Sequence, residues 1–231
     1  MPRLASECTI ILSVSTLRRI ARRLGYCWKR CRRSLRAQRD PLAFTACQQQ
    51  LQGLHQAEAR GEVAVYYADE CRFSRQAPVP YAWQRRGQLP VELPAVRGRG
   101  GCSVLGFWQA AGGGQPVVAY QRAGSFTADL FALAVDEFSQ TLPGPTVLVL
   151  DNASIHKARV VQAQQQVWAE RGLRLLFLPA YSPELNRIEI LWHRCKHYWL
   201  KPEHYRDEDT LFERVEHVLN HVGTTYTVTF A

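Results

Sequence analysis

The pattern of hydrophobic and polar positions changes near residue 61, from helical spacing to short apolar runs that alternate with longer amphipathic stretches. The short runs are rich in β-branched and aromatic residues, which favours strands, and the longer stretches repeat their apolar positions every three or four residues, which favours helices. After residue 61 the pattern therefore predicts three strands, then a helix, a strand, a helix, a strand and two helices.

Predicted strands lie at 62–69, 81–86 together with 101–110, 115–123, 146–151 and 173–179, and predicted helices at 126–142, 156–172, 183–200 and 207–222. Three leading strands separated by turns favour an antiparallel meander. Strands separated by a helix demand parallel neighbours joined by right-handed crossovers. We therefore expect an α/β domain with a mixed five-stranded sheet and helices on both faces.

A shorter amphipathic helix is predicted near the N-terminus, with apolar residues at i, i+3, i+4 and i+7: Leu17, Ile20, Ala21 and Leu24. Gly25 is the expected stop, and a serine or threonine among residues 13–16 is the expected N-cap. Such a helix can serve as the second helix of a helix-turn-helix, whereas residues 1–12 are too short and too β-branched to supply the first. We therefore expect a partial helix-turn-helix arm, cut off on its N-terminal side.

Pro41 separates this arm from a polar amphipathic helix that ends at Gly61. We interpret that helix as a connector between the arm and the strand-rich body. The expected organisation is an arm at 1–40, a connector helix at 41–61 and an α/β domain at 62–231.

The positive charge is concentrated in the arm. The whole chain has a formal net charge of +9, and residues 1–39 hold eleven Lys or Arg against one acidic residue, Glu7. A neutral body with a basic arm indicates a polyanionic partner, and nucleic acid is the commonest one. The cations expected to contact phosphates are Arg18, Arg19, Arg22, Arg23, Lys29, Arg30, Arg32 and Arg33. A solvated basic helix without a ligand is the alternative.

Composition excludes several other classes of protein. The sequence has no run of about eighteen apolar residues and no signal-peptide pattern, so we expect a bacterial cytoplasmic, nucleoid-associated protein without a membrane partner. Seven cysteines at scattered spacing, without a CxxC pair, predict free thiols and argue against a disulfide framework or a zinc module. Two histidine pairs at i, i+4 spacing, His193 with His197 and His217 with His221, are expected to be exposed or stacking rather than zinc ligands.

Two acidic residues close predicted strands. Asp69 ends the first strand and Asp151 ends the fourth. Both strands are apolar on both faces, so they should be central, and the carboxyl ends of central strands in such sheets are where ligands bind. Asp at a strand end also serves ordinary turns, and this is the alternative for either residue alone.

A third acid, Glu189, interrupts the apolar pattern of a helix. Ser182 and Pro183 are expected to start that helix, which places Glu189 in its second turn on the border of the face that packs on the sheet. Lys and Arg are absent from the i±3 and i±4 positions, so a metal ion shared with the two aspartates is the economical partner. Glu184 competes for this role, although the helix dipole already accounts for an acid in the first turn.

Three carboxylates around one point repel each other unless cations neutralise them. Oxygen-only ligands favour Mg²⁺ or Mn²⁺ over zinc. Two such ions can clamp the attacking and leaving oxygens of a phosphodiester. An acidic site and a basic arm then fit one substrate, DNA.

Three segments in this order, "YADECRFSRQAPVPYAWQRRGQ", "VLVLDNASIHKA" and "LPAYSPELNRIEILW", resemble the DDE endonuclease domain of bacterial insertion-sequence transposases in the mariner superfamily. The resemblance covers about residues 10–231 and implies a ribonuclease H-like fold with a DDE catalytic domain at 62–231. It also implies that Asp69, Asp151 and Glu189 are the metal-binding catalytic triad. The family usually has Pro where this chain has Arg187.

The same resemblance implies that Asn152 and His156 orient the second aspartate or touch the scissile phosphate. It implies a Mg²⁺-dependent transposase that cuts double-stranded DNA at terminal inverted repeats, joins the freed 3′-hydroxyl to target DNA, and acts as a homodimer when two ends are synapsed. Two alternatives stay open: a catalytically idle DNA-binding remnant, and a ribonuclease H-like nuclease acting on RNA–DNA hybrids.

Overall fold

The computed structural model describes residues 13–27, 36–78, 86–87, 89, 92, 100–111 and 116–228. The chain divides into two compact units, Met1–Ala37 and Gln38–Ala231. Each unit is described by itself. Predictions that concern Lys29, Arg30, Arg32 and Arg33, and the strand predicted at 81–85, lie outside the described residues.

The first unit contains helix α2, Val14–Arg23. Its N-cap is Ser13, whose hydroxyl accepts a hydrogen bond from the Thr16 amide at 3.1 Å. The chain leaves the helix through Gly25, which has a φ of 80° that a residue with a side chain rarely adopts. The helix predicted from the apolar spacing is confirmed, with its stop at the expected glycine.

A short 3₁₀ turn, η1 (Arg36–Gln38), spans the boundary between the two units, and the second unit continues with helix α3, Pro41–Ala59. The Asp40 carboxylate caps α3 by accepting hydrogen bonds from the Leu42 and Ala43 amides. Pro41 occupies the first helical position, where its missing N–H costs nothing. The predicted connector helix therefore exists.

Five strands form one mixed sheet in the order β3-β2-β1-β4-β5. The strands are β1 (Ala64–Ser74), β2 (Gly101–Gln109), β3 (Val117–Ala123), β4 (Thr146–Leu150) and β5 (Leu173–Phe177). The first three strands pair antiparallel, and β1–β4 and β4–β5 pair parallel. The predicted meander followed by parallel crossovers is confirmed.

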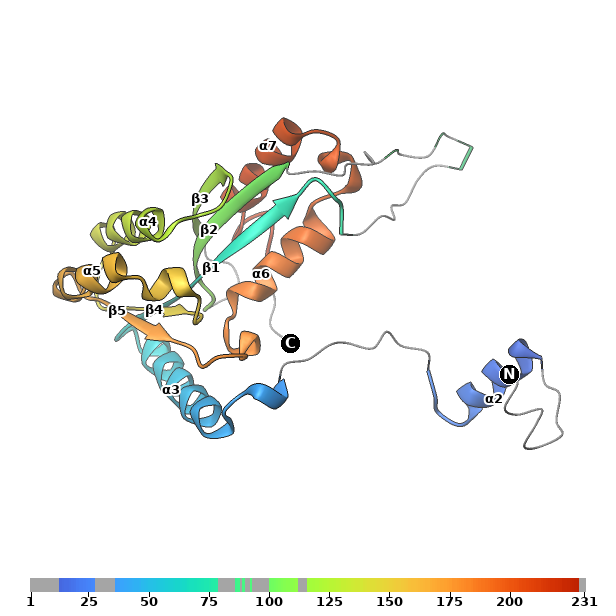
Figure 1. Ribbon diagram of the computed structural model, residues 1–231, viewed down its shortest axis with the longest axis horizontal. Coiled ribbons are helices and arrows are strands. Elements are labelled where there is room, and N and C mark those ends of the chain that lie inside the picture. Colours follow the sequence, from blue (N-terminus) through green and yellow to red (C-terminus); the bar gives the residue numbers. More distant parts are fainter. Residues whose placement is uncertain are drawn as a thin grey trace. The chain divides into compact units, whose positions relative to one another are not determined.

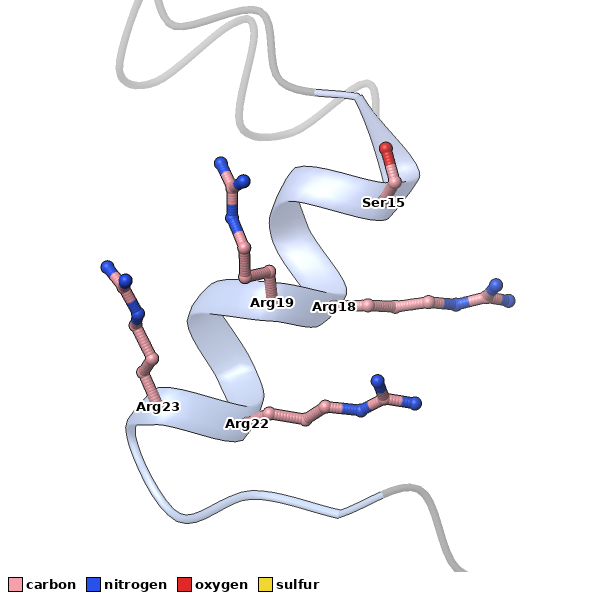
Figure 2. A pocket seen from close by; sticks show the side chains of 5 residues that line it. All are labelled: Ser15, Arg18, Arg19, Arg22 and Arg23. Atoms are coloured by element: carbon pink, nitrogen blue, oxygen red, sulfur yellow. The ribbon is translucent and has the colours of Figure 1, made fainter.

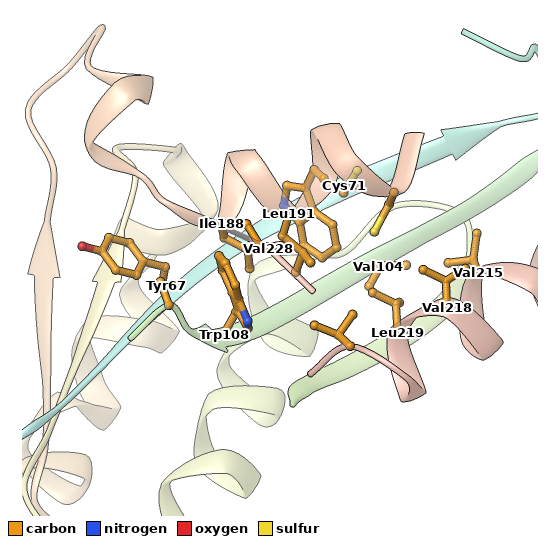
Figure 3. Close-up of a cluster of buried hydrophobic side chains, with 14 of the residues drawn as sticks. Tyr67, Cys71, Val104, Trp108, Ile188, Leu191, Val215, Val218, Leu219 and Val228 are labelled. Atoms are coloured by element: carbon orange, nitrogen blue, oxygen red, sulfur yellow. The ribbon is translucent and has the colours of Figure 1, made fainter. Parts of the chain in front are cut away.

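Helices cover both faces of this sheet (Figure 1). On one face α4 (Ala128–Gln140) and α5 (Arg159–Glu170) pack over a core that includes Phe107, Leu148 and Trp168. The other face is covered by α3, α6 (Ile188–Arg194) and α7 (Glu208–Asn220). Figure 3 shows this second core, in which Ile188 and Leu191 of α6 lie over the strands that carry Cys71 and Val104.

Four single helical turns complete the unit: η2 (Ser154–Lys157), η3 (Pro183–Leu185), η4 (Cys195–Trp199) and η5 (Pro202–Tyr205). The turn η4 is a π-helix that continues α6 directly. A single π turn inside or after an α-helix is uncommon and recurs at functional sites.

Two sequence predictions are wrong in detail. Asp69 does not end β1, because the antiparallel pairing with β2 continues from Asp69 as far as Ser74. The helix predicted at 183–200 is broken, because Asn186 takes an extended conformation between η3 and α6. Glu189 consequently lies in the first turn of α6 and not in a second turn.

Candidate active site

The two aspartates lie side by side on one face of the sheet. Asp69 follows Tyr67 by two residues and Asp151 follows Val149 by two, and both of these apolar residues belong to the core under α6. Because side chains alternate along a strand, each aspartate is directed to the same face as α6. The parallel ladder between β1 and β4 ends one residue before each aspartate. The sheet thus brings the two carboxylates together although β1 itself continues.

Helix α6 brings Glu189 to this face. Ile188, Leu191 and Trp192 are buried, whereas Glu189 is exposed at the margin of the packed face. The indole of Trp192 lies over Gly106, the residue of β2 that pairs with Asp69. A Cβ atom at Gly106 would be only 2.6 Å from Trp192 Cη2. The missing side chain therefore sets how closely the glutamate helix approaches the aspartate strand.

The half-buried Asp69 is the most strongly perturbed acid of this group. Burial, then repulsion by Glu189, raise the pKa of Asp69 to about 7, with a smaller contribution from Asp151. The Glu70 amide donates a 2.8 Å hydrogen bond to Asp69 Oδ1 and opposes the rise. The three carboxylates are therefore close enough to resist ionising together.

Lys196 is a residue of the site that the sequence predictions missed. Loss of hydration raises the pKa of Glu189, and the charge of Lys196 opposes that rise more strongly than Asp151 adds to it. The ammonium Nζ also lies 5.5 Å from the ring centroid of Phe73 on β1. Lys196 follows Glu189 by seven residues, which is two helical turns, and an inspection of that spacing would have found it.

Asp151 is held differently from Asp69. The imidazole of His156 lies with Nδ1 2.8 Å from Asp151 Oδ1 and holds the pKa of that carboxyl below its usual value, which burial opposes. The Ala153 amide donates a second bond, at 2.9 Å. His156 itself is buried against the ring of Phe131, with 4.4 Å between centroids. Asn152, the other predicted supporting residue, is exposed beside Asp151.

Glu184, the competing acid, pairs with Arg39 in another part of the second unit. Its Oε1 accepts from Arg39 Nη1 at 2.6 Å, and the Arg39 guanidinium also covers the ring of Phe44 at 4.0 Å. Glu184 and Arg187 line a groove of about 780 Å³ along α3. This arrangement favours Glu189 over Glu184 as the partner of the two aspartates.

The donor set fits a hard divalent cation, because Asp69, Asp151 and Glu189 offer only carboxylate oxygens. In the part of the chain that the structure describes, no three side chains of Asp, Glu, His or Cys are gathered tightly enough to ligate one ion. Burial, followed by repulsion from Glu189, raises the pKa of Asp69, so ionising all three groups without a cation is unfavourable. Divalent charge between the three groups would relieve the repulsion.

The basic helix α2 presents its cations to solvent. Figure 2 shows Arg18, Arg19, Arg22 and Arg23 extending away from the helix, together with Ser15. Within Val14–Arg23 no side chain is buried in the protein. The predicted phosphate-binding arginines are therefore available on the first unit.

Across the described ranges, none of the helices combines the length and the apolar character that crossing a membrane would require.

Comparison with known proteins gives three findings. Residues 64–212 match the DDE superfamily endonuclease family. The chain is 26% identical over 227 residues to the "Insertion element IS630 uncharacterized 39 kDa protein" of Shigella sonnei, an alignment covering 90% of this chain and 62% of that protein. The chain thus spans less than two thirds of that relative's length.

Two solved structures of Mos1 share the fold at low sequence identity. The Mos1 strand transfer complex is 16% identical with a TM-score of 0.57, covering 97% of this chain and 69% of the Mos1 chain. The Mos1 transposase paired-end complex with left transposon end is 15% identical with a TM-score of 0.59, covering 97% and 74%. The expected ribonuclease H-like, mixed five-stranded fold is confirmed.

Proposed function

The chain belongs to the DDE superfamily endonucleases, and from that premise we propose that it is a transposase, which cuts DNA at the ends of a mobile element and joins the freed end to target DNA. The observation that carries the proposal is the electrostatic coupling of Asp69, Asp151 and Glu189 on one face of the sheet. The likeness to an insertion-element protein and the shared fold with Mos1 transposase support it.

In this proposal Asp69, Asp151 and Glu189 are the catalytic residues and hold Mg²⁺ or Mn²⁺, most economically two ions. The Mos1 mariner paired-end complex has been solved with Mg and with Mn, which supports this choice of metal. When bound, such ions would polarise the phosphodiester and activate the attacking water or 3′-hydroxyl. No covalent intermediate between protein and DNA is required.

The remaining residues of the site have positioning roles. His156 fixes the orientation of the Asp151 carboxylate through its 2.8 Å contact and the packing of its ring on Phe131. Asn152 is exposed beside it, and we assign it a contact with the scissile phosphate. Lys196 limits the repulsion that Glu189 exerts before the metal arrives. His156 thus favours the ionised form of Asp151, and Lys196 favours that of Glu189.

Binding of double-stranded DNA is assigned to the arm, here taken as residues 1–40. Arg18, Arg19, Arg22 and Arg23 offer four exposed guanidinium groups on α2. The predicted contribution of Lys29, Arg30, Arg32 and Arg33 concerns residues outside the described ranges. Synapsis of two element ends requires two copies of the chain, and the paired-end complex of Mos1 supports a homodimer.

The test is cleavage of a plasmid that carries the DNA flanking the coding frame, in the presence of Mg²⁺ or Mn²⁺. We expect Asp69→Asn, Asp151→Asn and Glu189→Gln each to remove cleavage while DNA binding persists. Glu184→Gln is the matched control and should still cut, because Glu184 pairs with Arg39. Full cleavage by any of the first three variants would overturn the assignment of that residue.

The same proteins should be offered RNA–DNA hybrids. A chain that cuts hybrids and leaves duplex DNA intact would be a ribonuclease H-like nuclease and not a transposase. A chain that binds DNA but cuts neither substrate would be an idle remnant.

A further inference from the structure

The helix that carries Glu189 ends in an unusual turn. The Leu200 amide donates to the Cys195 carbonyl at 3.0 Å, five residues earlier, which is the hydrogen bond of a π-helix. A π turn holds more residues than an α turn, so positions i+4 and i+5 both come close to position i. In this hydrogen bond position i is Cys195, and His193 lies two residues before it, in the last turn of α6.

Three rings gather at this turn. The ring centroid of His193 lies 4.4 Å from that of His197 and 5.8 Å from that of Tyr198. The Arg194 guanidinium lies 5.0 Å from the centroid of the Tyr198 ring. Both histidines are exposed, and Tyr198 is 62% exposed. The rings therefore present aromatic surface to solvent rather than filling a core.

This aromatic surface begins next to the candidate active site. His193 follows Glu189 by four residues and His197 follows it by eight, so the three side chains form one stripe along the helix. Eight residues separate the ends of the stripe, which is about 12 Å at about 1.5 Å per residue. A strand leaving the scissile phosphate along α6 would pass over the rings.

The charge of the segment suits a polyanion. Residues 190–202 contain no Asp or Glu, and they contain Arg194, Lys196 and Lys201. Exposed rings among cations are the features with which proteins bind single-stranded nucleic acid, because every base has a face that can stack and every phosphate a charge. In a duplex the same base faces are already covered by neighbouring bases.

We propose that His193, His197 and Tyr198 form a stacking platform for unpaired bases of the DNA strand next to the cleavage site. The inference rests on the proposed function for the identity of the substrate. It adds a subsite that prefers single-stranded over duplex DNA. A transition-metal site at the histidine pair explains the data less well, because it gives no part to Tyr198 or Arg194, and no third ligand is gathered there among the described residues.

The test uses the full chain with Asp69→Asn, so that binding is measured without cleavage, and EDTA throughout. The probes are a short single-stranded oligonucleotide with one fluorescent aminopurine base and a duplex of the same sequence. We expect the combined His193→Ala and Tyr198→Ala substitutions to lower single-strand affinity about tenfold and to abolish aminopurine quenching. Duplex affinity should stay unchanged, because the base faces of a duplex are already covered and the α2 arginines still bind its phosphates.

Two further variants keep the result interpretable. Replacing His193 and Tyr198 by Phe keeps the rings and should retain quenching. Leu133→Ala removes another exposed apolar side chain, on α4 at the opposite face, and should change neither measurement. Folding of all variants is checked by circular dichroism.

Equal loss of single-strand and duplex affinity in the alanine variant would overturn the platform, as would quenching that appears only after Zn²⁺ replaces EDTA. Failure of the platform and failure of the proposed function are separable. If the wild-type chain cuts DNA but the ring substitutions do not change quenching in the Asp69→Asn form, only the platform is overturned. A chain that never cuts loses the transposase assignment while the stacking measurement stands.

Discussion

Asp69 bears the largest electrostatic cost in the candidate site, since burial and neighbouring charge raise its pKa from 3.8 to about 7. Between these two values the folded state binds more protons than the unfolded state, so stability falls as the pH rises through that window. We expect Asp69→Asn to remove the fall in metal-free protein. Its melting temperature should exceed the wild-type value near neutral pH and match it near pH 4.

Thermal unfolding in EDTA across that pH range measures the effect, and Asp151→Asn is the control of opposite sign. The pKa of Asp151 is lowered in the fold, so its ionised form contributes stability that is lost only as the pH falls through that lowered value. Asp151→Asn should therefore destabilise near neutral pH. Parallel pH profiles for the two variants would contradict the opposite pKa shifts of Asp69 and Asp151.

His156 gives a second prediction at this scale. Groups that orient a metal ligand typically contribute 10-fold to 100-fold to metal affinity or activity, and His156 contacts Asp151 at 2.8 Å. His156→Ala should raise the Mn²⁺ concentration needed for half-maximal cleavage by roughly that factor. A metal titration of cleavage checks it, with exposed Lys157→Ala as the neighbouring control. An unchanged midpoint would show that His156 only fills space against Phe131.

The proximity of Asp69 and Asp151 could be predicted from the sequence, because strand periodicity and topology decide which face of the sheet each side chain occupies. Glu189 was predicted at the border of the packed face, and it lies there, although it is more exposed than expected and sits in the first turn of α6. Lys196 escaped prediction because only the positions one turn from Glu189 were considered, whereas it acts from two turns away.

At the scale of elements, Gly106 controls the approach of α6 to β1. A methyl group there would meet the Trp192 ring at 2.6 Å, so the indole and the helix must shift. We expect Gly106→Ala to destabilise the fold by about 1–3 kcal/mol and to impair cleavage by displacing Glu189. Chemical denaturation and the plasmid assay measure the two effects.

Gly53 offers the matched control for this substitution. It lies inside α3, and an added Cβ would meet no atom within 4 Å. Gly53→Ala should stabilise the helix by about 0.5–1 kcal/mol and leave cleavage intact. Similar losses in both variants would show that the effect at Gly106 does not come from the Trp192 contact.

Element order was predictable because each strand and helix carries its own periodicity, while two boundaries were not. The end of β1 was missed because Glu70, Arg72 and Ser74 look polar, although the buried Cys71 and Phe73 between them continue the alternation of a strand. The break before α6 was missed because the signals at Ser182 and Pro183 start η3, and no residue type marks the extended backbone at Asn186.

At the scale of the whole chain, the basic helix and the acidic site belong to separate compact units. If DNA affinity comes mainly from the arm, replacing Arg18, Arg19, Arg22 and Arg23 by Gln should weaken binding equally for all sequences. The slope of log affinity against log salt should fall by roughly 3 to 4, at about 0.9 per phosphate contact. Replacement by Lys is the control and should keep the slope. A slope unaffected by Gln would place the phosphate contacts elsewhere.

The position of β1 between β2 and β4 also matters while the protein is being made. The meander β1-β2-β3 leaves the ribosome first, and the partner of Ala64–Ala68 on the other side is not synthesised until Thr146–Leu150. Until then an apolar strand exposes a row of unpaired amide and carbonyl groups, which is a template for association with other chains. Nascent chains that stop before β4 should therefore aggregate. Once β4 has been synthesised and has paired with β1, this tendency to aggregate should end.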